Sequence, residues 1–178
     1  MTVPAKPGLY AVHGSACAFS DLDIAEREPG IPLYVGKAQK SLASRDVRVH
    51  FSIGTPSGST TGQSTLRRSL AALLVDHLQL RPVPREKAPP HRFAMFALDE
   101  PSDARLTEWM HEHLRLATWV MPAEAGVSLG AVESAVITRL VSPLNLSGSP
   151  NPQFDLKAAR ARMARRARES VQAGRMES

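Results

Sequence analysis

The chain has 178 residues, of which 43% are hydrophobic, and a formal net charge of +5 at pH 7. This size fits one globular domain with its own core, and no apolar run reaches the roughly 18 residues of a membrane span. The N-terminus lacks a signal-peptide pattern, and the single Cys17 excludes an internal disulfide. We therefore expect a cytoplasmic protein that does not associate with a membrane.

Two short strands are predicted within the first 40 residues. Residues 7–13 (PGLYAVH) and 32–37 (PLYVGK) are rich in β-forming residues and are bounded by Pro or Gly. A loop joins them, which favours an antiparallel pair. Residues 41–53 then predict a helix, and the Gly/Ser/Thr-rich residues 54–64 predict a loop.

The rest of the chain mixes helices and strands, which predicts an α+β fold with a small antiparallel sheet. We place the main domain at residues 1–150 and a basic helical extension at 151–178. The remaining elements are helices over 64–80, 99–115, 128–141 and 155–172, strands over 93–98 and 116–122, and a Pro-rich connector over 81–91.

The positive charge is concentrated at the C-terminus. The segment from Asp155 to Ser178 holds seven Lys or Arg and three Asp or Glu, so it carries +4 of the total charge of +5. A basic tail on a nearly neutral body suggests a polyanionic partner, most often nucleic acid. A solvated helix that aids solubility is the alternative.

Polar side chains gather in and around the second predicted strand. The only tyrosines, Tyr10 and Tyr34, have similar contexts on strands that we expect to be neighbours. Each is also compatible with simple packing. Lys37 follows Gly36 at the end of the strand, where a lysine can reach a phosphate or accept a proton. The glycine spacing of a phosphate-binding G-x-x-x-x-G-K-[ST] loop is absent.

The predicted helix over residues 41–53 carries two arginines and a histidine. Arg45 shares a helix face with apolar residues, whereas Arg48 lies on a more polar face. An arginine on the inward face needs a phosphate or a carboxylate as partner, because an unpaired buried charge is costly. We favour Arg45 as the functional arginine and keep Arg48 as its rival. His50 lies near both in sequence.

The helix over 128–141 contains a carboxylate within its apolar stripe. Around Glu133, the apolar residues Leu129, Val136 and Ile137 lie three or four positions away. Buried carboxylates are rare unless they are paired or bind a metal. Glu133 is therefore a candidate metal ligand, with a salt bridge to an internal arginine as the alternative. Asn145 follows in P-L-N, just past the helix end.

In combination these motifs resemble the GIY-YIG nuclease superfamily. G-L-Y (8–10) and Y-V-G-K (34–37) resemble its two signatures, and Glu133 and Asn145 resemble its metal-binding glutamate and later asparagine. The resemblance covers about residues 7–147. Three spacings differ, since the tyrosines are 24 positions apart and the gaps from glycine to arginine and from arginine to histidine are each one residue longer than expected. The further matches are Arg45, His50-Phe51 and S-T-L-R-R-S-L (64–70).

The resemblance implies a three-stranded antiparallel sheet flanked by helices and a metal-dependent endonuclease. Glu133 would bind Mg²⁺ or Mn²⁺, and Arg45 would stabilise the charge on the phosphate. Tyr10 or Lys37 would take the proton from the attacking water. Tyr34 would orient that water or a phosphate oxygen. His50 would assist or contact DNA, and Asn145 would brace the helix of Glu133 or the metal shell.

The expected partner is DNA, with RNA as an alternative and with the choice between monomer and homodimer left open. The rival hypothesis is a protein that keeps this fold and binds nucleic acid without cleaving it. The candidate nucleic-acid contacts are Arg48, Arg67, Arg68, Arg160, Arg162, Arg165 and Arg166.

Overall fold

The structure, a computed structural model, describes residues 3–25, 30–43, 60–85, 95–146 and 154–176. The chain divides into two compact units. Unit 1 comprises Met1–Phe51 and Met110–Gln153, and unit 2 comprises Ser52–Trp109 and Phe154–Ser178. The predicted domain boundary near residue 150 stays a prediction. Each compact unit consists of two separate segments of the chain, so the division into units is a different one.

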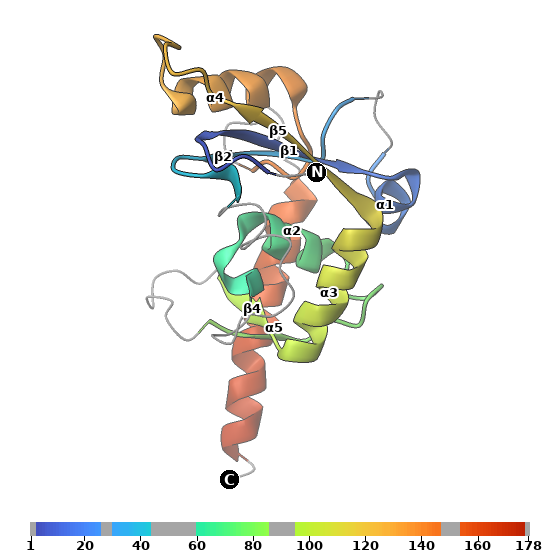
Figure 1. Cartoon of the computed structure of the whole chain (residues 1–178). Helices are drawn as coiled ribbons and strands as arrows, with labels where there is room; N and C mark the ends of the chain where they lie inside the picture. Colours follow the sequence, from blue (N-terminus) through green and yellow to red (C-terminus); the bar gives the residue numbers. More distant parts are fainter. Residues whose placement is uncertain (1–2, 26–29, 44–59, 86–94, 147–153, 177–178) are drawn as a thin grey trace. The chain divides into compact units, whose positions relative to one another are not determined.

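Unit 1 is built on a three-stranded antiparallel sheet, as predicted. Its strands are β1 (Gly8–Gly14), β2 (Tyr34–Ala38) and β5 (Leu114–Val120), in the spatial order β2-β1-β5. β1 is therefore the central strand, and β2 and β5 are edges. Figure 1 shows helix α4 lying along one face of this sheet. These findings confirm the α+β class and the three-stranded sheet.

The register of the sheet decides which side chains share a face. Leu9 of β1 lies opposite Lys37 on β2 and opposite Trp119 on β5. The next residue, Tyr10, lies opposite Gly36 on β2 and Thr118 on β5. Because side chains alternate between the two faces of a strand, these two rows project on opposite sides of the sheet.

Two helices of unit 1 have clear local causes. α1 (Ala16–Asp21) begins where the Ser15 side chain accepts a hydrogen bond from Ala18 N (3.2 Å), within a segment predicted as loop. α4 (Leu129–Leu140) begins where Ser128 accepts from Ala131 N, also at 3.2 Å. It ends at Val141, which has a left-handed backbone, two residues before Pro143.

Unit 2 combines helices with a two-stranded sheet. Its elements are η2 (Thr60–Gln63), α2 (Thr65–Leu73), β3 (Pro82–Pro84), β4 (Phe96–Leu98), α3 (Glu100–His113) and α5 (Phe154–Met176). The helix α5 buries Leu156, Ala159 and Met163, and packs on β3, α2 and β4. The helix α3 begins in unit 2 and ends in unit 1, where β5 follows directly.

Several predicted elements differ in extent. The helix predicted over 64–80 ends at Leu73. In the segment that follows it, the carbonyls of Leu78 and Gln79 accept hydrogen bonds from Arg105 of α3, at 3.0 and 2.8 Å. Gln79 has a left-handed backbone, which a helix does not continue through. β3 lies in the predicted Pro-rich connector, because its pairing with β4 is set by distant residues.

The remaining differences are small. The helix predicted to residue 115 ends at His113, and the strand predicted over 116–122 is β5. Most of the helix predicted over 41–53 lies outside the described residues. No helix of the described ranges is long and apolar enough to cross a membrane.

Candidate functional site

The two tyrosines come together beneath the sheet. Tyr10 is 2% exposed, and its ring centroid lies 6.1 Å from that of the partly buried Tyr34. The Tyr10 ring also crosses Gly36 on the neighbouring strand. A Cβ at Gly36 would overlap the ring and hydroxyl of Tyr10 and would lie 2.9 Å from Tyr10 Cε1. Glycine is therefore required at position 36, because any larger residue would occupy the space of the Tyr10 ring.

Glycine at position 8, in the first signature, is required for a similar steric reason. A Cβ at Gly8 would overlap the carbonyl oxygen of Trp119 on β5 and lie 3.0 Å from Leu42 Cδ1. The central strand can approach β5 this closely only with glycine at that position. Both signature glycines therefore serve packing within the sheet of unit 1.

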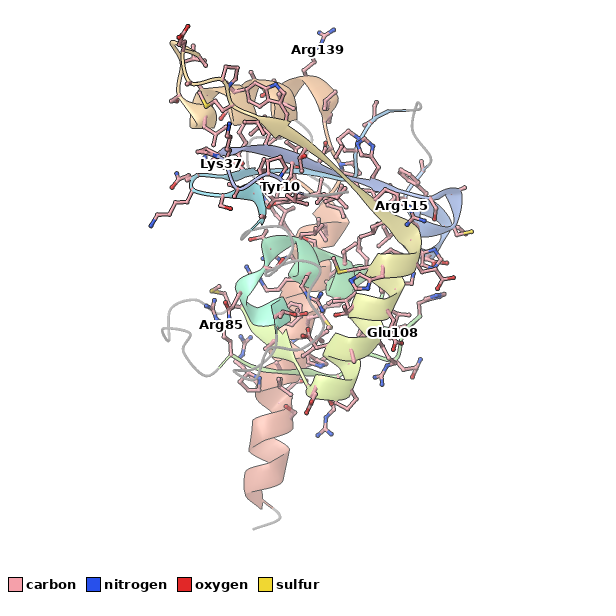
Figure 2. All side chains as sticks on the ribbon, viewed as in Figure 1. Tyr10, Lys37, Arg85, Glu108, Arg115 and Arg139 are labelled. Carbon is pink, nitrogen blue, oxygen red and sulfur yellow. The ribbon has the colours of Figure 1, made fainter. Side chains whose placement is uncertain are left out.

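On the other face of the sheet, Lys37 and Glu133 form an ion pair. Lys37 Nζ lies 2.7 Å from Glu133 Oε2, and the two side chains are 32% and 19% exposed. α4 brings Glu133 to this position because the helix packs on β2 and β1. Lys37 Nζ also lies 3.5 Å from the place of a Cβ at Gly130, in the first turn of α4. Figure 2 labels Lys37 and Tyr10 on the adjacent strands.

Asn145 holds the edge strand from outside. Its Oδ1 accepts from Val35 N and its Nδ2 donates to Val35 O, both at 2.8 Å. The adjacent Leu144 N donates to Leu33 O at 2.9 Å. The asparagine amide thus acts as a short extra strand that satisfies the backbone of β2. It ties the segment after α4 to the strand that carries Tyr34 and Lys37.

The sheet therefore separates the predicted site residues into two groups. Tyr10 and Tyr34 lie on one face, and Lys37 and Glu133 lie on the other, with Asn145 at the β2 edge. Tyr34 and Lys37 lie on either side of the point where Asn145 covers this edge at Val35, and their side chains project on opposite faces. The accessible members at this edge are Tyr34, Lys37 and Glu133.

The site has a limited set of metal ligands. Among the described residues there is no group of three or more His, Cys, Asp or Glu that would hold a metal ion. Glu133 offers a carboxylate, one of whose oxygens is paired with Lys37. Mg²⁺ is commonly held by one or two carboxylates, several waters and substrate phosphates. These residues thus fit a metal that binds together with a phosphate.

Three predicted site residues fall outside the described ranges. These are the rival arginines Arg45 and Arg48, and His50. Their predicted roles therefore remain predictions.

Arg67 and Arg68 were expected to contact nucleic acid, but the structure buries both. Arg67 is 0% exposed and its Nη2 donates to Asp103 Oδ1 (3.2 Å), Asp103 O (3.0 Å) and Thr107 Oγ1 (2.8 Å). Arg68 is 5% exposed and donates to Gly62 O at 2.7 Å. Their guanidinium groups hold unit 2 together, so we do not carry them forward as nucleic-acid contacts.

The buried pair also shifts ionisation. Burial opposes the charged form of Asp103, but Arg67 and hydrogen bonds from Thr60 and Thr61 outweigh it and lower the pKa of Asp103. Burial likewise lowers the pKa of Arg67, against the attraction of Asp103. A fully buried arginine in a helix looks like a surface residue in the sequence, because its carboxylate partner is 36 positions away.

The basic C-terminal residues are arranged on one helix. In α5 the side chains of Arg162, Arg165 and Arg166 are exposed, and Arg160 is partly buried. Arg166 lies 3.8 Å from Asp76, also in unit 2. The exposed face of α5 also carries Lys157 and Arg168, against the single carboxylate Glu169 among residues 156–170.

A comparison with known protein families gives the class of this protein. The chain matches the GIY-YIG catalytic domain over residues 15–168. The chain therefore belongs to the GIY-YIG family. The match extends past residue 150 into α5. No curated protein and no solved structure matches the chain.

Proposed function

We propose that this protein is a divalent-metal-dependent endonuclease that hydrolyses phosphodiester bonds in DNA. The observation that carries the proposal is the Lys37–Glu133 pair, in which α4 presents a partly exposed carboxylate beside a lysine of β2. Membership of the GIY-YIG family supports a nuclease, and hence a nucleic-acid substrate.

Each residue has a role that follows from its place. Lys37 is partly exposed and would contact the phosphate or accept a proton from water. Tyr34 would orient the water or a phosphate oxygen from the other side of the edge. Tyr10 is the alternative proton acceptor, but its burial fits better with supporting Tyr34 and β2. Asn145 is a positioning residue, because it acts on the site through the backbone of Val35.

Glu133 would hold Mg²⁺ or Mn²⁺ together with the substrate phosphate. When bound, the metal would supply Lewis-acid stabilisation of the charge that develops on the phosphate oxygens. Arg45, or its rival Arg48, would add a guanidinium to the same phosphate, whose oxygens match its planar fork. His50 would assist there or contact the DNA backbone.

The exposed basic face of α5 would bind the DNA backbone. Arg162, Arg165 and Arg166, with the partly buried Arg160, would neutralise phosphates without reading sequence. The affinity should fall steeply with salt, because each phosphate contact releases a counterion.

A second function remains in view, namely binding of nucleic acid without cleavage. It is favoured by one observation: the described residues contain no group of three or more His, Cys, Asp or Glu that would hold a metal ion, and the Glu133 carboxylate is paired with Lys37. The two functions share the α5 contacts and differ in metal dependence and product formation.

Cleavage of supercoiled plasmid separates the two. Purified protein would be incubated with Mg²⁺, with Mn²⁺ and with EDTA, beside Lys37→Met and the matched control Lys40→Met, whose lysine is exposed two residues after β2. The nuclease predicts metal-dependent nicking or linearisation that Lys37→Met reduces and Lys40→Met retains. DNA binding that is salt-sensitive, with no product under any of the three conditions, would establish the non-cleaving binder.

A further inference from the structure

One large aromatic side chain of the sheet is exposed. Trp119 on β5 is 43% exposed, whereas the other tryptophan, Trp109, is 5% exposed. Within the described residues, Trp119 and Val127 are the exposed large hydrophobic residues. The exposed indole of Trp119 offers a flat apolar face on which a planar ligand can stack.

The register places Trp119 on the same face of the sheet as the ion pair. Lys37, Leu9 and Trp119 form one row across β2, β1 and β5. Two strand spacings separate Lys37 from Trp119, which is roughly 10 Å. This is the scale of a single nucleotide, from its phosphate to the far side of its base.

Trp119 also forms one wall of an apolar groove. The groove has a volume of about 340 Å³ and is lined by Leu9, Ala117 and Trp119 from the sheet and by Val132 and Val136 from α4. Ala117 and Trp119 are exposed, so this side of β5 is accessible beside α4. A groove with few polar groups suits the flat face of a base and does not suit a sugar or a phosphate.

One lysine lies in this row, paired with Glu133, and a second lysine lies beside the residues that follow Trp119. Lys37 is at the β2 end, and the exposed Lys6 borders a second hollow of about 720 Å³ with Val120 and Met121, directly after Trp119. Proteins that bind single strands combine cations that follow the backbone with aromatic rings on which bases stack. This charge pattern favours a nucleotide over a second protein surface.

We propose that Trp119 stacks on an unpaired nucleobase of the substrate, next to the phosphate held at Lys37 and Glu133. This inference rests on the proposed function and names its substrate class, since a base can enter the groove only from a single strand, a mismatch or an extruded nucleotide. Trp119 is thus a positioning and specificity residue that acts beside the reacting phosphate.

The test uses the intact protein, in EDTA, with a short single-stranded oligonucleotide and the same oligonucleotide carrying abasic sites. Trp119 fluorescence is the part of the emission that wild type has and Trp119→Phe lacks. We expect the base-bearing oligonucleotide to change that part and the abasic one to leave it unchanged. Trp119→Leu keeps an apolar side chain but should weaken binding of the base-bearing oligonucleotide by roughly tenfold. It should not alter binding of the abasic oligonucleotide, and Trp119→Phe should bind nearly as wild type.

Three results would overturn the inference. The first is that Trp119→Leu weakens binding of both oligonucleotides equally. The second is that the oligonucleotide binds but leaves the Trp119 emission unchanged. The third is that the Trp119 emission changes with protein concentration alone and that Trp119→Leu lowers the mass measured by sedimentation. The last result would assign the groove to a second copy of the chain. Plasmid cleavage by the wild-type protein is measured separately. Stacking without plasmid cleavage would contradict the proposed activity, and plasmid cleavage without stacking would contradict only the role of Trp119.

Discussion

Replacing Gly36 with alanine tests how the sheet of unit 1 holds its tyrosine. The new Cβ would overlap the ring and hydroxyl of Tyr10, which is 2% exposed and has little room to move. Overpacking of this kind costs about 1–3 kcal/mol. The backbone at Gly36 is not left-handed, so alanine would recover about 0.4–1 kcal/mol by restricting the unfolded chain.

The expected net loss is therefore about 0–2.6 kcal/mol, and for a chain of this size up to roughly 10 °C in Tm. The matched control is Gly126→Ala, because a Cβ there meets nothing within 4 Å. We expect this control to unfold at or slightly above the wild-type temperature. Both variants would be measured by thermal unfolding and by plasmid cleavage.

A double variant makes the reasoning sharper. Adding Tyr10→Leu to Gly36→Ala removes the ring that the new methyl group meets, so the second change should cost less stability than Tyr10→Leu alone. Additive losses, or a Gly36→Ala protein as stable as Gly126→Ala, would refute the placement of the Tyr10 ring over Gly36.

Three further predictions concern the pairings in the two units. Asp103→Ala should lower the free energy of unfolding by about 3–5 kcal/mol in urea denaturation, because it leaves a buried guanidinium without its carboxylate. Because the pKa of Asp103 is lowered in the folded state, its ionised form stabilises the wild-type protein fully above about pH 4, and this stabilisation is lost as the pH falls further. The free energy of unfolding of Asp103→Ala should not show this decrease at low pH. Asn145→Leu should lower the free energy of unfolding by about 1–3 kcal/mol, because it removes the hydrogen-bond partners of Val35 N and Val35 O. Asn145→Asp keeps the acceptor for Val35 N and loses the donor to Val35 O, so it measures the two bonds separately. Replacing Arg162 and Arg165 by glutamine should reduce the slope of log affinity for DNA against log salt by about 1.8, and an unchanged slope would remove α5 from the interface.

The sequence predicted the sheet of unit 1 well, because its evidence is local. β-forming residues bounded by Pro or Gly indicate β1 and β2, the loop between them favours their pairing, and the apolar run LATWVMP (116–122) indicates β5. Ser128 and Pro143 likewise bracket α4. These features depend on a few adjacent residues, so they can be read without knowing the rest of the fold.

Features that depend on distant partners were missed or misread. β3 is a three-residue strand between prolines, and its pairing with β4 gives no local signal. Arg67 has the appearance of a surface arginine until Asp103 is placed beside it. Trp119 offered one signal that was overlooked, since it shares the outward positions of its strand with Arg115 and Ala117.

The central claim is that Glu133 works in phosphodiester hydrolysis, and one rate tests it most directly. The measurement is the initial rate of supercoiled plasmid nicking in Mg²⁺ by wild type, by Glu133→Gln and by the control Glu124→Gln, whose carboxylate is exposed in the loop before α4. The proposal predicts a rate for Glu133→Gln at least about 100-fold below wild type, with Glu124→Gln unchanged and DNA affinity retained. Nicking by Glu133→Gln at the wild-type rate would contradict the claim.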